Sequence, residues 1–390
     1  MSALPLSNLL LALFLYSYVL QVIPSPLASH QNRYVEHALH KRANLEVRQT
    51  TTTNTTTIDW IPTGSQGKIA NPPPAKAVYA GNVSKPISEL QEPGAQLGPP
   101  GTVPIPQVSA QYLANVASKG LPELLSSKSK LKRQYSNVHW YVTSDQDVNN
   151  IGGSAIYSLF DAFVNNNGDF SLLQTAVTKS GTNGGQTLEA GWINYPNQVA
   201  APHLFTYYTT DGYASQGDNV GGWNQDVAGW VQYDSEIFPG SVFSPTSVDG
   251  GDQYEMEIQY LLYEGNWWLW VLDRWIGYYP ATLFSNNISG VTLATGSDVI
   301  FYYGEIYQSE GPLTTTDMGS GEFAETGFGH SAYIHNMVYT DTSGNSQNYT
   351  AGFGDSDSSR YDHQNVISSD TTWGSYAYLG GPGAGGVVGG

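Results

Sequence analysis

The feature that most constrains this chain is the succession of short β-type runs, separated by turn residues, that fills residues 134–390. Polar and apolar residues alternate at 253–260, and residues 267–272 are almost all aromatic or aliphatic. A Glu-Gly-Asn turn joins the two runs, so their spacing predicts a β-hairpin. Many such strands between Gly, Asn and Asp turns favour an all-β fold, an antiparallel β-sandwich of two sheets.

Further strands are predicted at 204–210, 228–233 and 298–307, where β-branched and aromatic residues recur. One helix is predicted at 153–164, because apolar residues there recur at helical spacing. Composition supports a β-rich chain, since the 390 residues include 43 Gly and 27 Tyr and only 12% are charged. Coiled coils and helical repeats need long charged, Leu- and Ala-rich stretches, so the composition argues against both.

Charge divides the chain at Arg133. Residues 1–133 carry 12 Lys and Arg against 6 Asp and Glu, whereas residues 134–390 carry 3 against 27. This change of sign indicates two parts with different roles. The net charge of −18 argues against a nucleic-acid partner held through its phosphates. The chain has no cysteine, which excludes disulfides, thiolate metal ligands and a cysteine nucleophile.

Residues 1–28 have the features of a secretory signal peptide. Their apolar run at 9–20 is too short to span a membrane, and Pro24 and Pro26 end it before a Leu-Ala-Ser sequence. We therefore expect a secreted, extracellular protein with no membrane association once the signal is removed. Four acceptor motifs for N-linked glycans begin at Asn54, Asn82, Asn287 and Asn348.

Residues 29–133 have the composition of a propeptide. They include a Thr-rich stretch near 50–57 and a Pro-rich span at 72–106, and such sequence has too few apolar residues to offset its ordering entropy. We expect this pro-region to be largely unstructured. It ends in Lys132-Arg133, a dibasic pair of the kind that kexin-type processing proteases cleave. The mature domain would then be residues 134–390, with a flexible Gly-rich tail at 380–390.

No metal site and no cofactor are predicted. His330 and His335 are five residues apart, and the metalloprotease motif needs a spacing of four with a Glu between. The acidic loop at 355–362, which His363 follows, lacks the spacing of a calcium loop, and a solvated surface explains it better. No nucleophile elbow of the Gly-x-Ser-x-Gly type occurs.

Two carboxylates stand out because apolar residues surround them. Glu189 lies in QTLEAGW, and Glu305 lies in FYYGEIY, where it shares a strand face with Tyr303 and Tyr307. On the face of Glu189, Gly191 leaves room for another backbone to approach. A carboxyl among aromatic rings loses hydration, so its pKa rises toward that of a general acid. A glutamate on the polar face of an edge strand would give the same sequence pattern.

The chain resembles the neprosin family of glutamic peptidases in a series of segments that occur in family order. These are QTLEAGW at 186–192, PHLFTYYTTDGY at 202–213, GWVQ at 229–232, EGNWW at 264–268, IGYYPATLF at 276–284, YGEI at 303–306 and TDMGSGEF at 316–323. The resemblance implies two antiparallel sheets with a concave active-site face, and it implies that Glu189 and Glu305 are the catalytic residues. It also implies acid endopeptidase activity that cleaves after proline.

The sequence therefore predicts a secreted glutamic endopeptidase, made as a zymogen, whose substrates are proline-containing proteins or peptides. One carboxyl would act as base and the other as acid, and which glutamate has which role stays open. Tyr303 and Tyr307 would line the substrate cleft or simply pack in the sheet. One alternative is a glycoside hydrolase with tryptophans such as Trp267, Trp268 and Trp270 along its groove. The other is a non-catalytic module that binds carbohydrate or cell wall.

Overall fold

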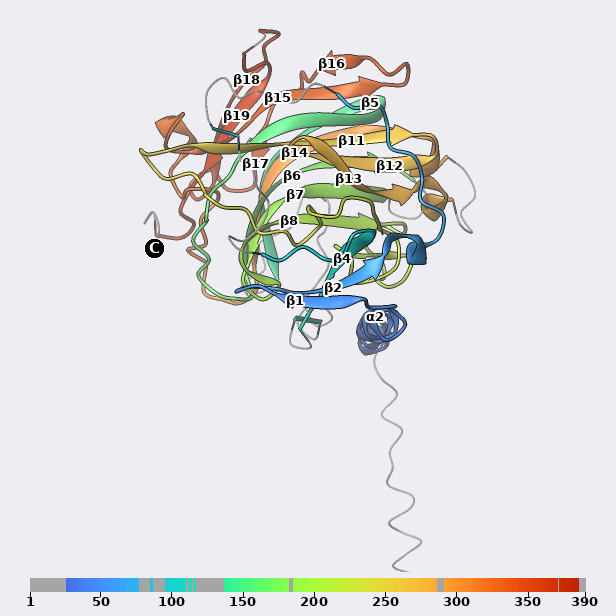
Figure 1. Cartoon of the computed structure of the whole chain (residues 1–390). Coiled ribbons are helices and arrows are strands. Elements are labelled where there is room, and N and C mark those ends of the chain that lie inside the picture. Colours follow the sequence, from blue (N-terminus) through green and yellow to red (C-terminus); the bar gives the residue numbers. More distant parts are fainter. Residues whose placement is uncertain are drawn as a thin grey trace, which may run out of the picture.

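The computed structural model of the 390-residue chain describes residues 26–76, 85–86, 95–109, 112–113, 116, 137–181, 185–285, 291–370 and 372–385. This part of the chain is almost entirely β-structure (Figure 1). The predicted signal run, the processing site at Lys132-Arg133 and the acceptors Asn82 and Asn287 lie outside the described residues. Asn54 and Asn348 are described, and both are exposed. Within the described ranges, no helix has the length and hydrophobicity needed to cross a membrane.

The first layer of the sandwich, layer A, is a curled antiparallel sheet that holds the central part of the chain (Figure 1). Its strands pair in the order β17, β5, β14, β6, β7, β8 and β9. They are β5 (Val138–Ser158), β6 (Phe170–Lys179), β7 (Gln186–Tyr195), β8 (Val199–Thr209), β9 (Gly221–Trp223), β14 (Ser297–Gln308) and β17 (Gly354–Asp355). The strands predicted at 204–210 and 298–307 correspond to β8 and β14.

The second layer, layer B, pairs in the order β10, β13, β12, β11, β5, β15, β19 and β18, with β16 beside β15. Its strands are β10 (Val231–Gln232), β11 (Tyr254–Tyr263), β12 (Asn266–Val271), β13 (Arg274–Pro280), β15 (Ala332–Asp341), β16 (Ser346–Asn348), β18 (Asp362–Val366) and β19 (Tyr376–Gly380). β11 and β12 form the predicted hairpin, whose two-residue turn has Glu264 and Gly265 at positive φ. The strand predicted at 228–233 is shorter, since only β10 forms there. Short 3₁₀ turns occur at η2 (Ala281–Phe284), η3 (Leu293–Thr295) and η4 (Ala324–Thr326).

Strand β5 belongs to both layers. Residues 138–150 pair with β14, and residues 152–158 pair with β11 on one side and β15 on the other. Between them, Gly152 has φ +139°, and a Cβ there would lie 2.0 Å from the Tyr260 carbonyl oxygen. The helix predicted at 153–164 is therefore wrong, because residues 153–158 gain a strand partner on each side. Such pairing outweighs a local helical spacing of apolar residues.

The core lies between the two layers, and alternate residues of each strand fill it. Leu188, Ala190 and Trp192 of β7 pack in one cluster with Ile258 and Tyr260 of β11. The Tyr260 hydroxyl also donates to the backbone oxygen of residue 189 across the layers, at 2.9 Å. Because side chains alternate along a strand, the intervening residues of β7 project from the opposite face of layer A.

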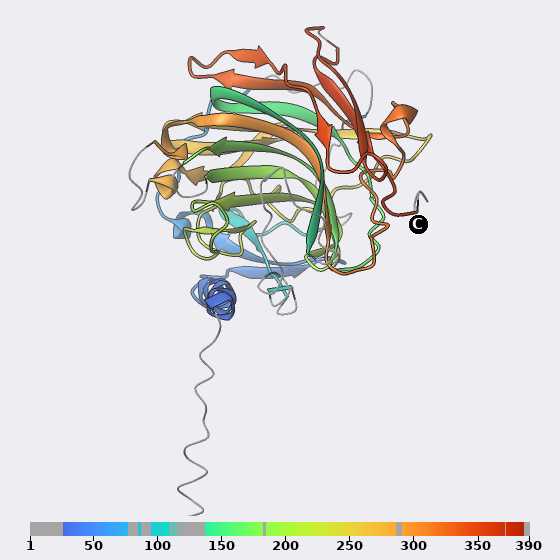
Figure 2. The same cartoon turned by 180° about the vertical axis from the view of Figure 1, so that it is seen from behind.

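The expected pro-region holds more order than its composition predicts. It forms α2 (Pro26–Ala43), η1 (Thr63–Gln66) and a small antiparallel sheet of β1 (Gln49–Thr52), β2 (Thr57–Pro62) and β4 (Thr102–Pro106). Figure 1 shows these elements below the curled sheet, and Figure 2 shows from behind how the larger strands arch over them. Lys85–Pro86 adds a short parallel strand, β3, to β11. Ile58 and Trp60 pack against Phe238 of the part 134–390, so burial there supplies the apolar contacts that the segment lacks by itself.

The tail predicted to be flexible from residue 380 is hydrogen-bonded to the rest of the chain as far as Ala384, whose N–H donates to the Thr314 oxygen at 2.8 Å.

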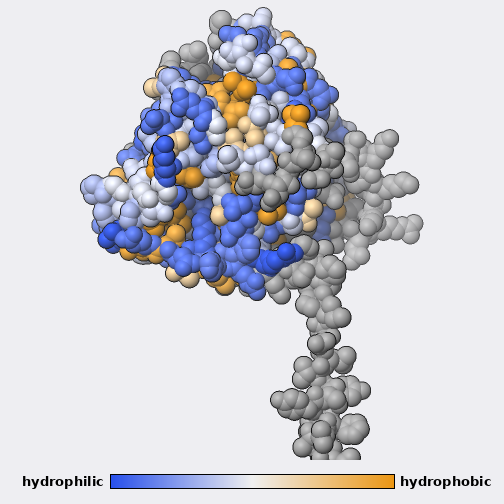
Figure 3. Space-filling model, turned by 90° about the vertical axis from the view of Figure 1, so that its right-hand side faces the viewer, coloured by the Kyte–Doolittle hydropathy of each residue, from blue (hydrophilic) through white to orange (hydrophobic). Residues whose placement is uncertain are grey.

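The face seen in Figure 3 is mainly hydrophilic and is interrupted by smaller hydrophobic patches. Such a surface is ordinary for a globular protein.

Gly191 provides a test of the packing within layer A. Its Cβ, if present, would lie 2.0 Å from the Leu173 carbonyl oxygen, so β7 and β6 approach there as the sequence predicted. We expect Gly191→Ala to lower the free energy of unfolding by at least about 2 kcal/mol, because backbone atoms must move. Urea unfolding at constant pH measures this change. As a control, Gly352→Ala meets no atom within 4 Å and should change stability by less than about 0.5 kcal/mol. Equal losses in the two variants would contradict the close approach.

Candidate active site

The two glutamates singled out in the sequence project from one face of layer A, which we call the carboxylate face. Glu189 is on β7 and lies opposite Ala176 of β6, while Glu305 is on β14 and lies opposite Leu172 of β6. Directly opposed residues share a face, and residues four apart on β6 do so as well. The structure therefore brings together two carboxyls that are more than a hundred residues apart in the sequence, with a single strand between them.

Glu189 is almost completely enclosed, with 2% of its surface exposed. Its Oε1 accepts a hydrogen bond from the Tyr213 hydroxyl at 2.5 Å, and its Oε2 accepts one from Gln174 Nε2 at 3.2 Å. The Tyr303 hydroxyl lies 3.5 Å from Oε2. Three neutral donors therefore surround this carboxyl, and none of them brings a positive charge.

Burial raises the pKa of Glu189 to about 7, because the ionised form loses its hydration. The Tyr213 hydrogen bond opposes this rise of the pKa, and the nearby charge of Glu305 adds to it. At acid pH Glu189 is therefore protonated and can donate a proton. Burial also raises the pKa of Tyr213 and of Tyr303 well above the ordinary value, so both hydroxyls remain donors.

Glu305 has a different neighbour. It is 1% exposed, and its Oε1 lies 2.5 Å from His139 Nδ1 at the start of β5. The His139 ring also contacts Tyr307, with ring centroids 4.8 Å apart. When Nδ1 carries the ring hydrogen, the imidazole donates a hydrogen bond to the carboxyl oxygen. The two glutamates thus have unlike surroundings, one among neutral donors and one beside an imidazole.

The two tyrosines predicted to line the cleft differ in their contacts. Tyr303 reaches Glu189, as described above, and packs with Phe301 and Tyr141 beside the carboxyl. Tyr307 instead stacks on Phe170 at 5.3 Å between ring centroids and donates to Asn137 Oδ1 at 2.6 Å. The structure therefore gives Tyr303 a direct hydrogen-bonding position, while Tyr307 packs beside the His139 ring.

Sequence reasoning missed three residues of the site: Gln174, Tyr213 and His139. Gln174 stands between the apolar residues Leu172 and Ala176 on its face of β6, a signal that the sequence does contain. Tyr213 is in a loop at φ +63°, so no strand periodicity marks it. His139 meets Glu305 only through the register of β5 on β14, which pairs Tyr307 with His139.

The histidines and the acidic loop that were considered as metal ligands contact side chains of opposite type within the protein. His330 lies 2.6 Å from Asp249, and His335 lies 3.2 Å from Glu255. In the loop at 355–362, Arg360 pairs with Asp357. Among the described residues, no group of three His, Asp or Glu side chains is placed to hold a metal ion.

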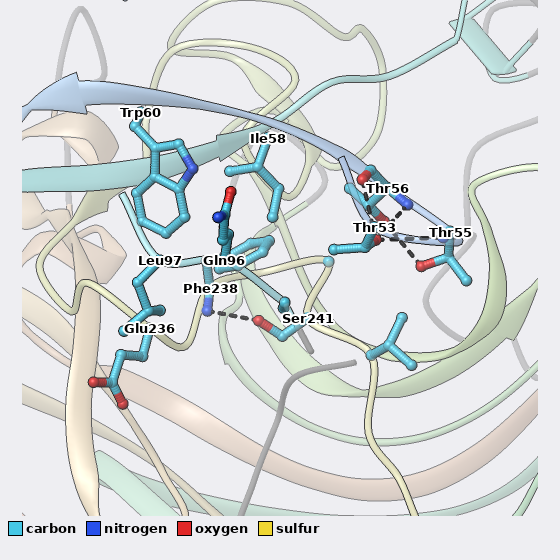
Figure 4. Close-up of a pocket in the computed structure, with 13 residues that line it drawn as sticks. Thr53, Thr55, Thr56, Ile58, Trp60, Gln96, Leu97, Glu236, Phe238 and Ser241 are labelled. Carbon is cyan, nitrogen blue, oxygen red and sulfur yellow. Dashed lines mark hydrogen bonds between the residues drawn. The ribbon is translucent and has the colours of Figure 1, made fainter. Parts of the chain in front are cut away.

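A pocket is lined by residues of 53–60, 95–97 and 236–242 (Figure 4). Its walls are mainly apolar and include Ile58 and Trp60 of β2 and Phe238 of the mature part. Neither Glu189 nor Glu305 lines it. Because β2 forms one wall, the pocket depends on the packing of β2 against Phe238.

The raised pKa of Glu189 has a consequence for stability. The folded chain holds this pKa near 7 rather than 4.5, so ionisation of Glu189 costs folding free energy as the pH rises between those values. We expect Glu189→Gln to match the native chain at pH 4 and to exceed its stability by about 3 kcal/mol at pH 8. Urea unfolding at both pH values measures this difference in stability. Glu325→Gln, a change at an exposed residue, is the control. If the free energy of unfolding of Glu189→Gln depended on pH as that of the native chain does, the raised pKa of Glu189 would be refuted.

Comparisons with known proteins bear on the same region. A family model described as Neprosin matches residues 167–382, more than half of the chain. Among solved structures, the chain is similar to scytalido-glutamic peptidase with a peptide-based transition state analog, with 9% identity, TM-score 0.30, and coverage of 64% of this chain and 99% of that chain. SCP-B, a member of the eqolisin family of peptidases in a complex with the tripeptide Ala-Ile-His, gives 8% identity and TM-score 0.29 at the same coverage. CG-16, a homodimeric agglutinin from chicken liver, gives 9% identity and TM-score 0.21, over 44% of this chain and 93% of that chain. The family match, which includes both Glu189 and Glu305, shows that the chain belongs to the neprosin family.

Proposed function

We propose that this chain is a glutamic endopeptidase in which Glu189 and Glu305 carry out the hydrolysis of a peptide bond. The observation that carries the proposal is the pair itself, two buried carboxyls on one face with opposite surroundings. Hydrolysis needs one group that takes a proton from water and one that gives a proton to the departing nitrogen. Membership of the neprosin family supports this assignment, and the resemblance noted in the sequence adds a preference for proline before the cleaved bond.

The different surroundings of Glu189 and Glu305 suit the two carboxyls to different roles in the reaction. Glu305, whose Oε1 contacts His139 Nδ1, would take a proton from water as the water oxygen attacks the peptide carbonyl carbon. Glu189, whose pKa is raised to about 7, would give its proton to the nitrogen as the carbon–nitrogen bond breaks. Afterwards Glu305 holds the extra proton and Glu189 lacks one, so transfer between them through solvent restores the starting state.

The alternative of a glycoside hydrolase needs tryptophans beside the two carboxyls, and the structure puts them elsewhere. The Trp267 ring is buried between the layers, and its Nε1 donates to the Leu293 oxygen at 2.8 Å. Trp268 and Trp270 lie on the opposite face of β12 in layer B. A carbohydrate groove lined by these rings would not contain the glutamates, so a peptide substrate is favoured.

A zymogen form is supported by the way the pro-region is anchored. Tyr34 of α2 and Tyr112 both donate to Asp226 Oδ2, at 2.8 and 2.9 Å, and all three side chains are buried. Lys41 Nζ donates to two backbone oxygens of the same loop, those of residues 225 and 227. The Tyr112 ring also contacts Tyr195 at the end of β7, at the margin of the carboxylate face. We propose that the secreted chain stays latent while this segment is attached.

Lowering the pH does not by itself weaken the contact between the pro-region and Asp226. Burial raises the pKa of Asp226 to about 6, while the tyrosine hydrogen bonds and Lys41 oppose the rise. Because the docked carboxyl binds its proton more readily than a free one, protonation between pH 6 and 4 favours docking there. The overall attraction between the basic and acidic parts does weaken with falling pH, so the two effects oppose each other. Chain cleavage, which makes the contact bimolecular, is then needed for release.

The catalytic assignment predicts that Glu189→Gln and Glu305→Gln each lower kcat by at least about 100-fold, since the amide keeps the shape and loses the proton chemistry. Processed protein would be assayed on a proline-containing peptide library at pH 4, with cleavage positions read by mass spectrometry. Activity should be highest below pH 5 and should fall as the pH rises through 7, where Glu189 loses its proton. Glu325→Gln serves as control. A folded variant of either glutamate with normal turnover would exclude the pair as catalyst.

The processing assignment predicts that the mature protein starts within a few residues of Gln134 and that the uncut chain is latent. Changing both Lys132 and Arg133 to Ala should keep the protein uncut and inactive at pH 4, because the anchored segment stays tethered. N-terminal mapping of secreted protein, together with the peptide assay, measures both points. A mature start upstream of Leu121, or full activity with residues 29–133 attached, would disprove the assignment.

A further inference from the structure

The outer face of layer B carries an aromatic cluster that the proposed reaction does not use. It consists of Trp268 and Trp270 of β12 and Trp275 and Tyr278 of β13, and we call it the aromatic platform. The strand register pairs these residues across β12 and β13, with ring centroids 4.5 Å apart for Trp268 and Tyr278 and 5.2 Å for Trp270 and Trp275. Four large rings therefore form one continuous surface on a sheet face that does not contact layer A.

A segment of the pro-region covers this platform. The blue chain that leaves β2 in Figure 1 rises past β13 and β12, and its residues 69–76 read IANPPPAK. Ala70 packs on the rings and donates its N–H to the Tyr278 hydroxyl at 3.0 Å. Nearby, Gln66 exchanges two hydrogen bonds with the backbone of Gln232, at 2.8 and 2.9 Å. Pro73, in the middle of the proline triplet, is buried.

Lys76 contacts the platform at the other end of the segment. Its Nζ lies 5.1 Å from the centre of the Trp270 ring and donates to Glu257 Oε1 and Gln259 Oε1, both at 2.6 Å. The ammonium group therefore has an aromatic face, a carboxylate and an amide oxygen around it. Glu257 and Gln259 stand on β11 beside the platform, and the register pairs Gln259 with Trp270.

These contacts have the chemistry of polyproline recognition. Three prolines, 72–74, lie between Ala70 on the rings and Lys76 beside Trp270. A proline triplet is already extended, so little conformational entropy is lost when the segment is held at these two contacts. The platform also has donors that its occupant leaves unused, since within the described ranges the indole N–H groups of Trp268 and Trp275 have no hydrogen-bond partner. Carbonyl oxygens of a better-fitting proline-rich ligand would accept from such donors. The 27 acids against 3 bases of residues 134–390 further favour a ligand with a positive charge.

We propose that the aromatic platform is a binding site for extended, proline-rich peptide segments that carry a lysine, and that residues 69–76 occupy it until the pro-region leaves. Two parts of this proposal rest on the proposed function. These are that the site becomes vacant in the mature protein, and that it then binds a substrate at a distance from Glu189 and Glu305. The binding itself does not rest on it, because it needs only the platform, Glu257 and Gln259.

The test supplies the segment as a separate peptide. The full chain carries Glu189→Gln, to prevent cleavage, and in an opened form also Pro73→Asp and Lys76→Ala, to displace its own segment. A fluorescent peptide with the sequence of residues 68–78 is titrated and its anisotropy measured. We expect the opened chain to bind the peptide at least tenfold more tightly than the chain with its segment intact. Replacing the lysine at position 76 in the peptide by alanine should weaken binding at least fivefold.

Two variants of the opened chain locate the bound peptide. Trp270→Ala and Glu257→Gln should each weaken binding at least fivefold, and Glu257→Gln covers the case in which loss of the buried ring impairs folding. Phe328→Ala and Glu325→Gln, an exposed ring and an exposed carboxyl elsewhere, are the matched controls and should have no effect. Binding that both site variants leave unchanged, or equal binding to the opened and intact chains, would overturn the proposal.

A glucan oligosaccharide added as competitor separates this ligand class from a carbohydrate. Displacement of the peptide by the sugar at lower concentration than by unlabelled peptide would assign the face to carbohydrate and overturn the peptide proposal. The outcome is also independent of the catalytic assignment. A chain that binds the peptide as expected, but whose processed form with Glu189 restored cleaves no peptide, would keep this site and refute the proposed function.

Discussion

The two layers depend on β5, because this strand pairs in both. Its first part lies along β14 and its last part lies between β11 and β15, with the change of partners at Gly152, where no side chain fits. Each end of the strand then fixes a different element. His139 at the start reaches Glu305, and the Ser158 oxygen at the end accepts from the Trp192 indole of β7 at 2.8 Å. A single continuous strand thus sets both the spacing of the layers and the surroundings of one carboxyl.

The same physical effect, loss of hydration, governs three parts of the molecule. It raises the pKa of Glu189 and so provides a proton donor in the acid range. At Asp226, which Tyr34 and Tyr112 contact, it raises the pKa to about 6 and so favours the protonated carboxyl at acid pH. On the aromatic platform, Ala70 and Lys76 of the proline-rich segment cover part of the ring area. In each case the groups concerned are removed from water.

The pro-region gains its order from these contacts. Its own apolar residues are few, yet Tyr34, Trp60 and Lys76 each contact a different residue of the part 134–390, namely Asp226, Phe238 and Glu257. Such anchors lie far apart in the sequence, so composition cannot reveal them. A segment can therefore have the composition of a disordered chain and still be held in place by a larger neighbour.

What the sequence determined by itself was local. Alternation and turn chemistry predicted the β11–β12 hairpin, the shared face of Glu305, Tyr303 and Tyr307, and the close backbone approach at Gly191, because each follows from the period of a strand or the size of one residue. The tertiary structure decided which residues meet across strands. It turned residues 153–158 from a predicted helix into a strand with two partners, and it brought His139 and Tyr213 to the two carboxyls. Register and burial are properties of the packed chain, so no local pattern carries them.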